Sequence, residues 1–423
     1  MSGKETFIGG DDVGAIIVDV GSYMTKIGYG GEDCPRQVWP SVVGVKESGD
    51  KRFPLNFLSY LEDVSVEPCL KYVDGDLILN GDVFEEIIRT TSGKIGLSTD
   101  LREHPILLTE PSKHNRQIRE KEVEIMFEKF DVPAVYTAKK AILSAFSVGR
   151  SSGLVVDIGA TATSIVPILD GYTLQKPLCE YPIGGDFLDD QIARHLLKEK
   201  NLSISPNFSF KKIIHKDKPL SYESVNLEKV TSSYIEYGKR EVLRNIKESI
   251  CRCVEHEEVA KTSSALATST YELPDGTLID SEPIGIRVPE CLLNPEMIIN
   301  DSEFPPVNTN GFPGLCSAIS NTIIACDIDI RKDLIGAVIL TGGTSIIPGL
   351  ADRVSKSLAE DDKLSGGGPK LKIISPNSTV ERRFSSWIGG SILASLGSFQ
   401  QMWFSKEEYT EHGAKLVERK CSN

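Results

Sequence analysis

The chain has 423 residues, of which 40% are hydrophobic and 25% charged, as is usual for a globular protein of two or more domains. Its 47 basic and 60 acidic residues give a formal charge of -13, which argues against non-specific binding to nucleic acid. No apolar run is long enough to cross a bilayer, and the first six residues lack the apolar stretch of a signal peptide. Nine scattered cysteines, with no zinc-type spacing, indicate reduced thiols in a cytoplasmic or nuclear protein.

The first predicted element is a cluster of strands over residues 13–45. In it the apolar run Ala15–Val18 is followed by Asp19, Gly21 and Ser22 and then by more β-branched sequence. This order predicts a strand, a tight turn and a second strand. Glycine in the turn lets backbone N–H groups approach a phosphate, and an aspartate at a strand end can hold a hydrated cation.

The following segments predict an irregular region and then two helices. Residues 46–82 carry scattered charge and turn signals, so we expect no regular structure there. Residues 115–130 predict an amphipathic helix whose apolar face holds Ile118, Ile125, Met126 and Phe130. Residues 134–148 predict a second helix that ends at Gly149.

The hairpin pattern of the N-terminal strands returns in Gly153–Ser164, where Asp157 and Gly159 take the places of Asp19 and Gly21. Further along, residues 186–199 predict a helix and residues 201–221 a solvated loop with a basic run.

Residues 232–253 predict a longer helix that carries Arg244, Lys247 and Glu248 on one face. Residues 337–349 predict a strand and a Gly-Gly turn, followed by a helix from Leu350, and helix N-termini favour anions. Residues 365–369 predict a flexible surface loop.

Strands separated by helices, with the two aspartates 138 residues apart (157 minus 19), predict an α/β protein of two related halves. Two such hairpins facing each other would clasp a nucleotide polyphosphate and a divalent cation between the halves. Each pattern also has an ordinary interpretation, as a structural hairpin, a βα turn or a solvated helical face. The chain has neither a G-x-x-x-x-G-K-[ST] nor a G-x-G-x-x-G motif, so a Walker or Rossmann site is not indicated.

Several segments resemble the actin superfamily over most of the chain, least at residues 46–104 and 200–230. They are Asp19–Lys26, Gly28–Pro35, Leu108–Pro111, Ile125–Phe130, Asp327–Leu334, Trp387–Leu396, Gln400–Trp403 and Arg419–Cys421. Within that superfamily the nuclear actin-related proteins are most similar, on Gly9–Ala15, Tyr23, Tyr271–Gly276 and Val380–Ser386.

The resemblance implies an actin-like ATPase fold, α/β in class, with two related lobes of two subdomains each around a central nucleotide cleft. Residues 1–45, 83–147 and 385–423 would form subdomain 1, and residues 46–82 subdomain 2. Residues 148–183 and 306–384 would form subdomain 3, and residues 184–305 subdomain 4.

The resemblance also implies a site for ATP or ADP with Mg²⁺. Asp19 and Asp157 would hold the metal through water. The implied nucleotide contacts come from both hairpins, the long helix and the third turn: Gly21, Ser22, Tyr23, Lys26, Gly159, Ala160, Gly185, Arg244, Lys247, Glu248, Gly343, Thr344, Ile347 and Arg383.

Three positions depart from the actin pattern and predict little or no hydrolysis, so we do not expect an enzyme. Lys140 stands where actin has a glutamine that positions the attacking water, Ser164 where it has a histidine, and Ala160 where it has an aspartate. A lysine has donors but no acceptor, so it cannot orient water as an amide oxygen can.

By this resemblance the chain is a nuclear scaffold subunit, with some cytoplasmic presence, of chromatin-remodelling or histone acetyltransferase complexes. It would pair with monomeric actin on an amphipathic helical segment of a large subunit, with no membrane and no sequence-specific nucleic-acid contact. The docking groove would be lined by Phe146, Gly149, Tyr172, Leu393, Leu396 and Met402. The alternatives are an active actin-like or sugar-kinase-like ATPase and a filament-forming actin, the last disfavoured because residues 46–82 and 298–306 do not resemble actin's contact segments.

Overall fold

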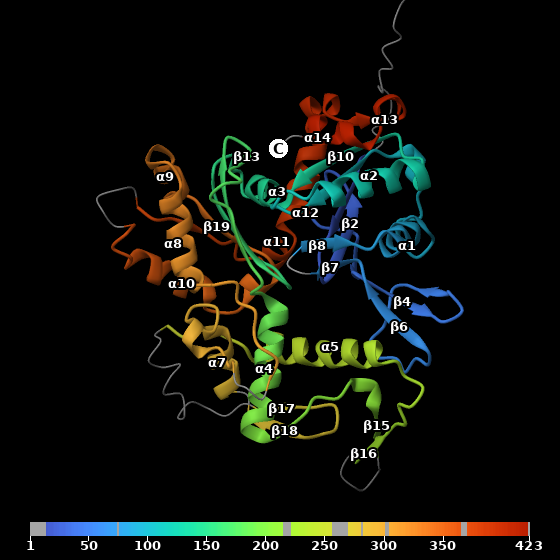
Figure 1. Cartoon of the computed structure of the whole chain (residues 1–423), viewed down its shortest axis with the longest axis vertical. Coiled ribbons are helices and arrows are strands. Elements are labelled where there is room, and N and C mark those ends of the chain that lie inside the picture. The colour runs from blue at the N-terminus through green and yellow to red at the C-terminus, as the bar shows by residue number, and fades with distance from the viewer. Residues whose placement is uncertain are drawn as a thin grey trace, which may run out of the picture.

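The computed structural model describes residues 14–73, 76–214, 221–255, 270–280, 282–300, 304–364 and 370–421. Figure 1 shows two groups of helices and strands, which meet where helices α3 and α12 lie. Each group is built around one six-stranded sheet. The predicted loop at 365–369, residues 215–220 of the loop predicted at 201–221, and residues 301–303 lie outside the described residues.

The first sheet has the strand order β21-β10-β9-β1-β2-β3. Its strands are β1 (Ile16–Val20), β2 (Met24–Tyr29), β3 (Gln37–Pro40), β9 (Ile106–Glu110), β10 (Ala134–Lys139) and β21 (Phe404–Ser405). β1 is antiparallel to β2 and parallel to β9. The helices of this half are α1 (Gly81–Ser92), α2 (Arg116–Phe130), α3 (Lys140–Ser147), α12 (Ser385–Ser395), α13 (Lys406–His412) and α14 (Val417–Lys420).

The second sheet has the order β13-β12-β11-β19-β20, with β14 also paired to β12. Its strands are β11 (Gly153–Ile158), β12 (Thr163–Leu169), β13 (Tyr172–Thr173), β14 (Cys179–Tyr181), β19 (Val338–Thr341) and β20 (Ile373–Ile374). The helices of this half are α4 (Gly185–Lys200), α5 (Ser232–Ile250), α7 (Glu282–Glu290), α8 (Leu315–Ala325), α9 (Ile328–Ile335), α10 (Leu350–Ala359) and α11 (Thr379–Arg383).

Smaller strands extend both halves away from the main sheets. In the first half these are β4 (Val42–Lys46), β5 (Lys51–Arg52), β6 (Val64–Pro68), β7 (Leu70–Val73) and β8 (Asp76–Leu79). In the second half they are β15 (Phe210–Ile213), β16 (Ser221–Ser224), β17 (Thr270–Glu272) and β18 (Leu278–Asp280). The short 3₁₀ turns are η1 (Leu101–Glu103), η2 (Asn207–Ser209), η3 (Pro295–Met297), η4 (Gly343–Ile346), η5 (Gly397–Gln401) and η6 (Ala414–Leu416).

The two sheets repeat one arrangement, which confirms the predicted relation between the halves. In each sheet an antiparallel hairpin, β1–β2 or β11–β12, has a third strand parallel to its first strand, β9 or β19. β1 and most of β11 are buried, because helices cover both faces of sheets with parallel pairs.

The close packing of α3 against α12 depends on glycine. A Cβ on Gly389 would lie 1.8 Å from the carbonyl oxygen of Leu143, so only glycine lets the two helices come this close. On the same helix the fully buried Trp387 donates from its indole N–H to the carbonyl oxygen of Ile17, which fixes α12 against β1.

A small separate core joins the strands around β6 to α5 and the turn η2. Its buried members are Leu55, Val64, Phe208, Val230 and Tyr234. Figure 1 shows α5 running between α4 and the strands β4 and β6. The two halves of the molecule therefore touch at this outer end as well as at α3 and α12.

Some secondary-structure predictions were wrong, because the local sequence pattern did not reveal strands that are held by distant parts of the chain. Residues 134–139 form strand β10 rather than the start of a helix, since this apolar run is held between β9 and β21. Residues 46–82 contain strands as well as turns, and residues 210–213 form a strand within the predicted loop. The helix expected at 232–253 ends at Ile250.

The remaining helix predictions are confirmed to within a residue or two. The helix predicted at 115–130 is α2, which begins after Asn115, whose side chain accepts from the N–H of Ile118. Ile118, Ile125 and Met126 are buried as expected, and the partly buried Phe130 packs against the same core. The subdomain boundaries stay a prediction.

Candidate functional site

The two predicted hairpins close with the same tight turn. The N–H of Gly21 donates to the carbonyl oxygen of Met24 at 3.0 Å, and the N–H of Gly159 donates to that of Ala162 at 3.0 Å. A Cβ on Gly21 would lie 2.8 Å from the oxygen of Met24, so this turn needs glycine. The sequence echo therefore corresponds to a repeated geometry.

The turns of the two hairpins are in direct contact. The hydroxyl of Thr161 donates to the hydroxyl oxygen of Ser22 at 2.9 Å, across 139 residues of sequence. The two half-buried turns therefore face each other, as a site shared by both hairpins requires.

The carboxylate of Asp19 is fully buried and surrounded by donors. Its Oδ1 accepts from the hydroxyl of Thr109 at 2.6 Å and lies 3.2 Å from Nζ of Lys140. Its Oδ2 accepts from Nζ of Lys26 at 3.0 Å and from the hydroxyl of Ser386 at 2.9 Å. Asp19 thus accepts three hydrogen bonds and makes an additional ion pair with Lys140, which leaves little spare capacity on a carboxylate with about four acceptor positions.

The two aspartates differ in their electrostatic surroundings. Burial works to raise the pKa of Asp19, but the charges of Lys140 and Lys26 outweigh it and hold that pKa well below its usual range. Burial raises the pKa of Asp157, and the same two lysines oppose that rise only in part. The negative charge of Asp19 is therefore balanced by the two lysines, whereas that of Asp157 is balanced less completely.

Tyr23 in the first turn points across to α5 rather than into its own hairpin. The guanidinium carbon of Arg244 lies 3.5 Å from the centre of the Tyr23 ring, a cation–π contact. The Tyr23 hydroxyl donates to Oε2 of Glu241 at 3.2 Å. Arg244 also pairs with Glu241 and, at 2.9 Å, with Asp186. Tyr23 therefore links the first turn to the second half of the chain.

Lys247 of α5 is held beside the start of α4 and the third turn. Its Nζ donates to the carbonyl oxygen of Gly185 at 2.7 Å and lies 2.8 Å from Oδ1 of the buried Asp189. A Cβ on Gly185 would come within 3.0 Å of both Lys247 Nζ and the hydroxyl oxygen of Thr344. The Thr344 hydroxyl donates to the carbonyl oxygen of Gly159 at 2.8 Å.

Three other predicted nucleotide contacts lie at the margin of this cluster. Glu248 and Arg383 are exposed, and Ile347 packs against the core of the second half. The neighbouring Arg382 makes the contact with the third turn, because its guanidinium donates to the carbonyl oxygen of Ser345 at 2.9 Å. A Cβ on Gly343 would meet no atom within 4 Å, so this turn has free space beside it.

Sequence reasoning missed several residues of the cluster, namely Thr109, Thr161, Asp189, Glu241, Arg382 and Ser386. One signal was available: Asp186 and Asp189 lie one helical turn apart at the start of α4, where acidic side chains are favoured. Thr109, Glu241 and Ser386 contact the first hairpin from distant segments. Thr161 lies in the second turn itself, and Arg382 contacts the third turn.

Three of the residues predicted to line the partner groove have exposed apolar side chains. Tyr172, Leu396 and Met402 are 60%, 47% and 45% exposed. Phe146 and Leu393 are partly buried against the first core. Phe146 also approaches the turn before Tyr172, since its ring lies 3.8 Å from where a Cβ on Gly171 would stand.

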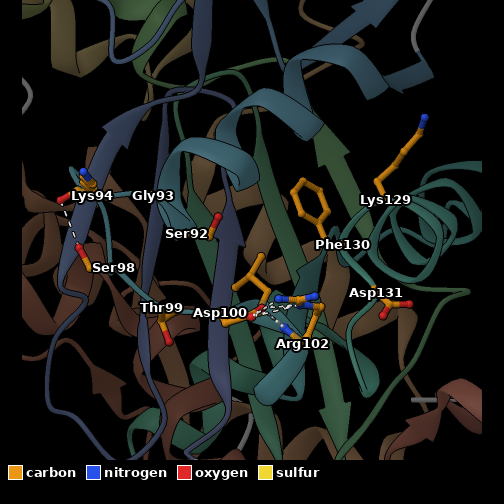
Figure 2. A pocket seen from close by; sticks show the side chains of 11 residues that line it. Ser92, Gly93, Lys94, Ser98, Thr99, Asp100, Arg102, Lys129, Phe130 and Asp131 are labelled. Atoms are coloured by element: carbon orange, nitrogen blue, oxygen red, sulfur yellow. Dashed lines mark hydrogen bonds and ion pairs between the residues drawn. The ribbon is translucent and has the colours of Figure 1, made fainter.

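A pocket of about 750 Å³ lies elsewhere, at the ends of α1 and α2. Figure 2 shows side chains that line it, including the pair formed by Asp100 and Arg102. None of its lining residues belongs to either hairpin, to α5 or to the third turn. It is therefore distinct from the predicted nucleotide site.

Two further results concern membranes and metals. In the part of the chain that the structure describes, no helix has both the length and the apolar character to cross a membrane. Over the same residues, no cluster of three or more histidine, cysteine or acidic side chains is arranged to hold a metal ion. All nine cysteines are free thiols.

Comparison with known proteins matches these features to one family. The actin family model matches residues 10–422. The protein "Actin-related protein 4" of Arabidopsis thaliana is 38% identical over 98% of this chain and 99% of its own length, and that of Oryza sativa subsp. japonica is 39% identical over the same shares. The "Actin-related protein 4" of Yarrowia lipolytica is 31% identical over 97% of each chain. With the repeated hairpins and the two sheets, these matches show that the chain belongs to the actin family and has the actin fold.

Proposed function

We propose that this actin-related protein is a nuclear scaffold subunit that holds ATP between its two hairpins without turning it over. In this proposal it belongs to chromatin-remodelling or histone acetyltransferase complexes and pairs there with monomeric actin. The observation that carries the first part is the contact between the two hairpin turns, because it brings two glycine-containing turns to one place.

The surroundings of Lys140 support slow turnover. Its ammonium group donates to the carbonyl oxygen of Val20 at 2.6 Å and pairs with Asp19 at the base of the first turn. An ammonium group has no acceptor, so it cannot take a proton from the attacking water. Ala160 and Ser164 in the second hairpin carry neither a carboxylate nor an imidazole that could compensate.

The residues around Asp19 do not fit a metal ion in the way the family resemblance implies. Asp19 accepts three hydrogen bonds from protein donors and pairs with the Lys140 ammonium, so a hydrated cation would have to compete with these partners. We therefore derive no step through a metal. In this proposal the backbone N–H groups of the turns and Lys26 bind the phosphates.

A single-turnover experiment with purified protein and ATP tests this part. We expect ATP to bind and to remain unhydrolysed over a time in which conventional actin would turn over. Hydrolysis at a rate equal to or above that of actin would refute the proposed role of the lysine, since groups that orient water supply much of the rate.

The exposed apolar side chains of Tyr172, Leu396 and Met402 support the proposed docking of a partner helix. Aromatic, leucine and methionine side chains beside an open glycine suit an amphipathic helix, which inserts apolar side chains at i, i+3 and i+4. Gly149 offers such an opening, because a Cβ there would meet no atom within 4 Å.

The substitution Tyr172→Asp tests the docking surface. It should place an unpaired charge against the apolar face of the helix and abolish incorporation into the complex. ATP binding should be unaffected, because Tyr172 on β13 pairs with Leu169 of β12, outside both glycine turns. Ile328→Asp is the matched control, since Ile328 is an apolar residue 75% exposed on α9. Wild-type incorporation of a folded Tyr172→Asp protein would rule out this surface.

A further inference from the structure

Lys140 places a second ammonium group at the end of the proposed site where a metal ion would be expected. We propose that Lys140 is the built-in counter-ion of the bound polyphosphate, so that the chain binds a nucleoside triphosphate without a divalent cation. This inference rests on the proposed nucleotide binding and deepens it by naming the cation.

The first argument is the set of partners around Asp19. Thr109 and Lys140 approach Oδ1 at 2.6 and 3.2 Å, and Lys26 and Ser386 approach Oδ2 at 3.0 and 2.9 Å. Mg²⁺ requires near-ideal octahedral geometry and usually reaches carboxylates directly or through its own waters. A completely buried carboxylate that accepts three hydrogen bonds and pairs with a second ammonium group is poorly placed for either.

The second argument is the position of Lys140 itself. It is the first residue of α3, directly after β10, and its Nζ reaches back to both Val20 and Asp19 at the end of β1. It donates a hydrogen bond to Val20 and forms an ion pair with Asp19, and no further acceptor among the described residues contacts its three N–H groups, which leaves at least one donor over. The side chain is 18% exposed, so this remaining donor is not sealed from an incoming ligand.

The third argument is the balance of charge. Lys140 and Lys26 act electrostatically on both Asp19 and Asp157, so two ammonium groups already face two carboxylates. The implied family arrangement would instead have one lysine and one divalent cation. A divalent cation added here would crowd a third positive centre beside Asp19, which already pairs with both ammonium groups. A lysine can bind phosphate as a point charge, and a tethered one need not be captured from solution.

A different role for Lys140 would be purely structural, as a partner that neutralises Asp19 and fixes the end of β1. In that case the polyphosphate would still need a metal ion, and removing the metal would weaken binding. The two roles therefore differ in one measurable quantity, the dependence of ATP affinity on divalent cations.

The experiment measures the affinity of the purified full-length protein for ATP by calorimetry, in excess Mg²⁺ and in EDTA. We expect the two dissociation constants to agree within about threefold. A dissociation constant at least about tenfold larger in EDTA would overturn the inference while leaving the proposed nucleotide binding intact. Absence of ATP binding under both conditions would refute the proposed function and this inference together.

The substitution Lys140→Gln gives a second, independent arm. It replaces the ammonium by an amide, so ATP binding should become dependent on Mg²⁺ by about tenfold or more. Lys129→Gln, at an exposed position of α2, is the matched control and should keep the wild-type response to EDTA. If Lys140→Gln is folded by circular dichroism and still binds ATP equally well in EDTA and Mg²⁺, Lys140 is not the counter-ion.

Discussion

The contact between the strands around β6 and helix α5 can be tested with one hydroxyl group. Tyr234 is completely buried, and its ring stacks on Phe208 with the ring centres 5.0 Å apart. Its hydroxyl oxygen lies 2.8 Å from the carbonyl oxygen of Asn56 and 2.6 Å from that of Ser59. Tyr234→Phe removes this hydroxyl and keeps the ring, so the apolar packing of the small core is retained.

The magnitude follows from the hydrogen bonds lost. A hydroxyl has one proton and donates to one of the two carbonyl groups at a time, so one net hydrogen bond disappears. Such a bond contributes about 0.5–1.5 kcal/mol, and an acceptor left buried and unpaired costs about 1–3 kcal/mol. We expect the contact to weaken by about 1–2 kcal/mol, which raises the population of molecules with this contact open by about 5- to 30-fold.

Hydrogen exchange reports this opening directly, because two backbone N–H groups bond across the contact. The N–H of Asp63 donates to the carbonyl oxygen of Lys229 at 2.9 Å, and the N–H of Val66 donates to the hydroxyl oxygen of Ser233 at 3.0 Å. Exchange at these two groups should accelerate by about 5- to 30-fold in Tyr234→Phe, in proportion to the open population.

The matched control is Tyr409→Phe. The Tyr409 hydroxyl donates to Oε1 of Glu128 at 2.8 Å within the first half, so this variant also loses one hydrogen bond but none across the contact. It should leave exchange at Asp63 and Val66 unchanged. Equal protection of these two groups in Tyr234→Phe and in the wild type would refute the reasoning.

Two further predictions concern the first core. Burial, with a smaller effect of Glu110, raises the pKa of Glu122 to about 8. The folded chain therefore keeps a proton that the unfolded chain releases. The free energy of unfolding should fall as the pH rises from about 4.5 to about 8. Glu122→Gln should flatten that fall by at most about 1.4 kcal/mol per pH unit in urea unfolding, and an unchanged slope would show that Glu122 does not titrate there. Gly389→Ala should lower the free energy of unfolding by about 1–3 kcal/mol or more, because its Cβ would overlap the carbonyl oxygen of Leu143. Gly397→Ala, where a Cβ meets nothing within 4 Å, should have little effect, and equal stability of the two variants would contradict the packing argument.

Local patterns in the sequence predicted much of the fold. An apolar run followed by Asp-x-Gly predicted both hairpins, because a buried strand that ends in a glycine turn needs only neighbouring residues to form. The repetition of that pattern at Asp19 and Asp157 predicted two related halves. Helix α2 could be predicted because its buried face repeats with helical period and Asn115 caps its first turn.

Other features depended on contacts between distant parts of the chain. Residues 134–139 form a strand because β9 and β21 lie on either side of them, and no local pattern separates a short buried strand from a helix. Tyr23, a bulky residue in a tight turn, is accommodated because Arg244 and Glu241 receive its side chain from 218 or more residues away.

The candidate site shows most clearly which features the sequence predicts and which depend on the tertiary structure. The sequence alone identified Lys140 as a departure from the actin pattern and Asp19 as an acid at the end of a strand. Only the tertiary structure placed the Lys140 ammonium group against both Asp19 and the carbonyl oxygen of Val20, 120 residues away. The reason is physical: charge pairing and burial are properties of atoms brought together in space, and residue order determines them only through the completed fold.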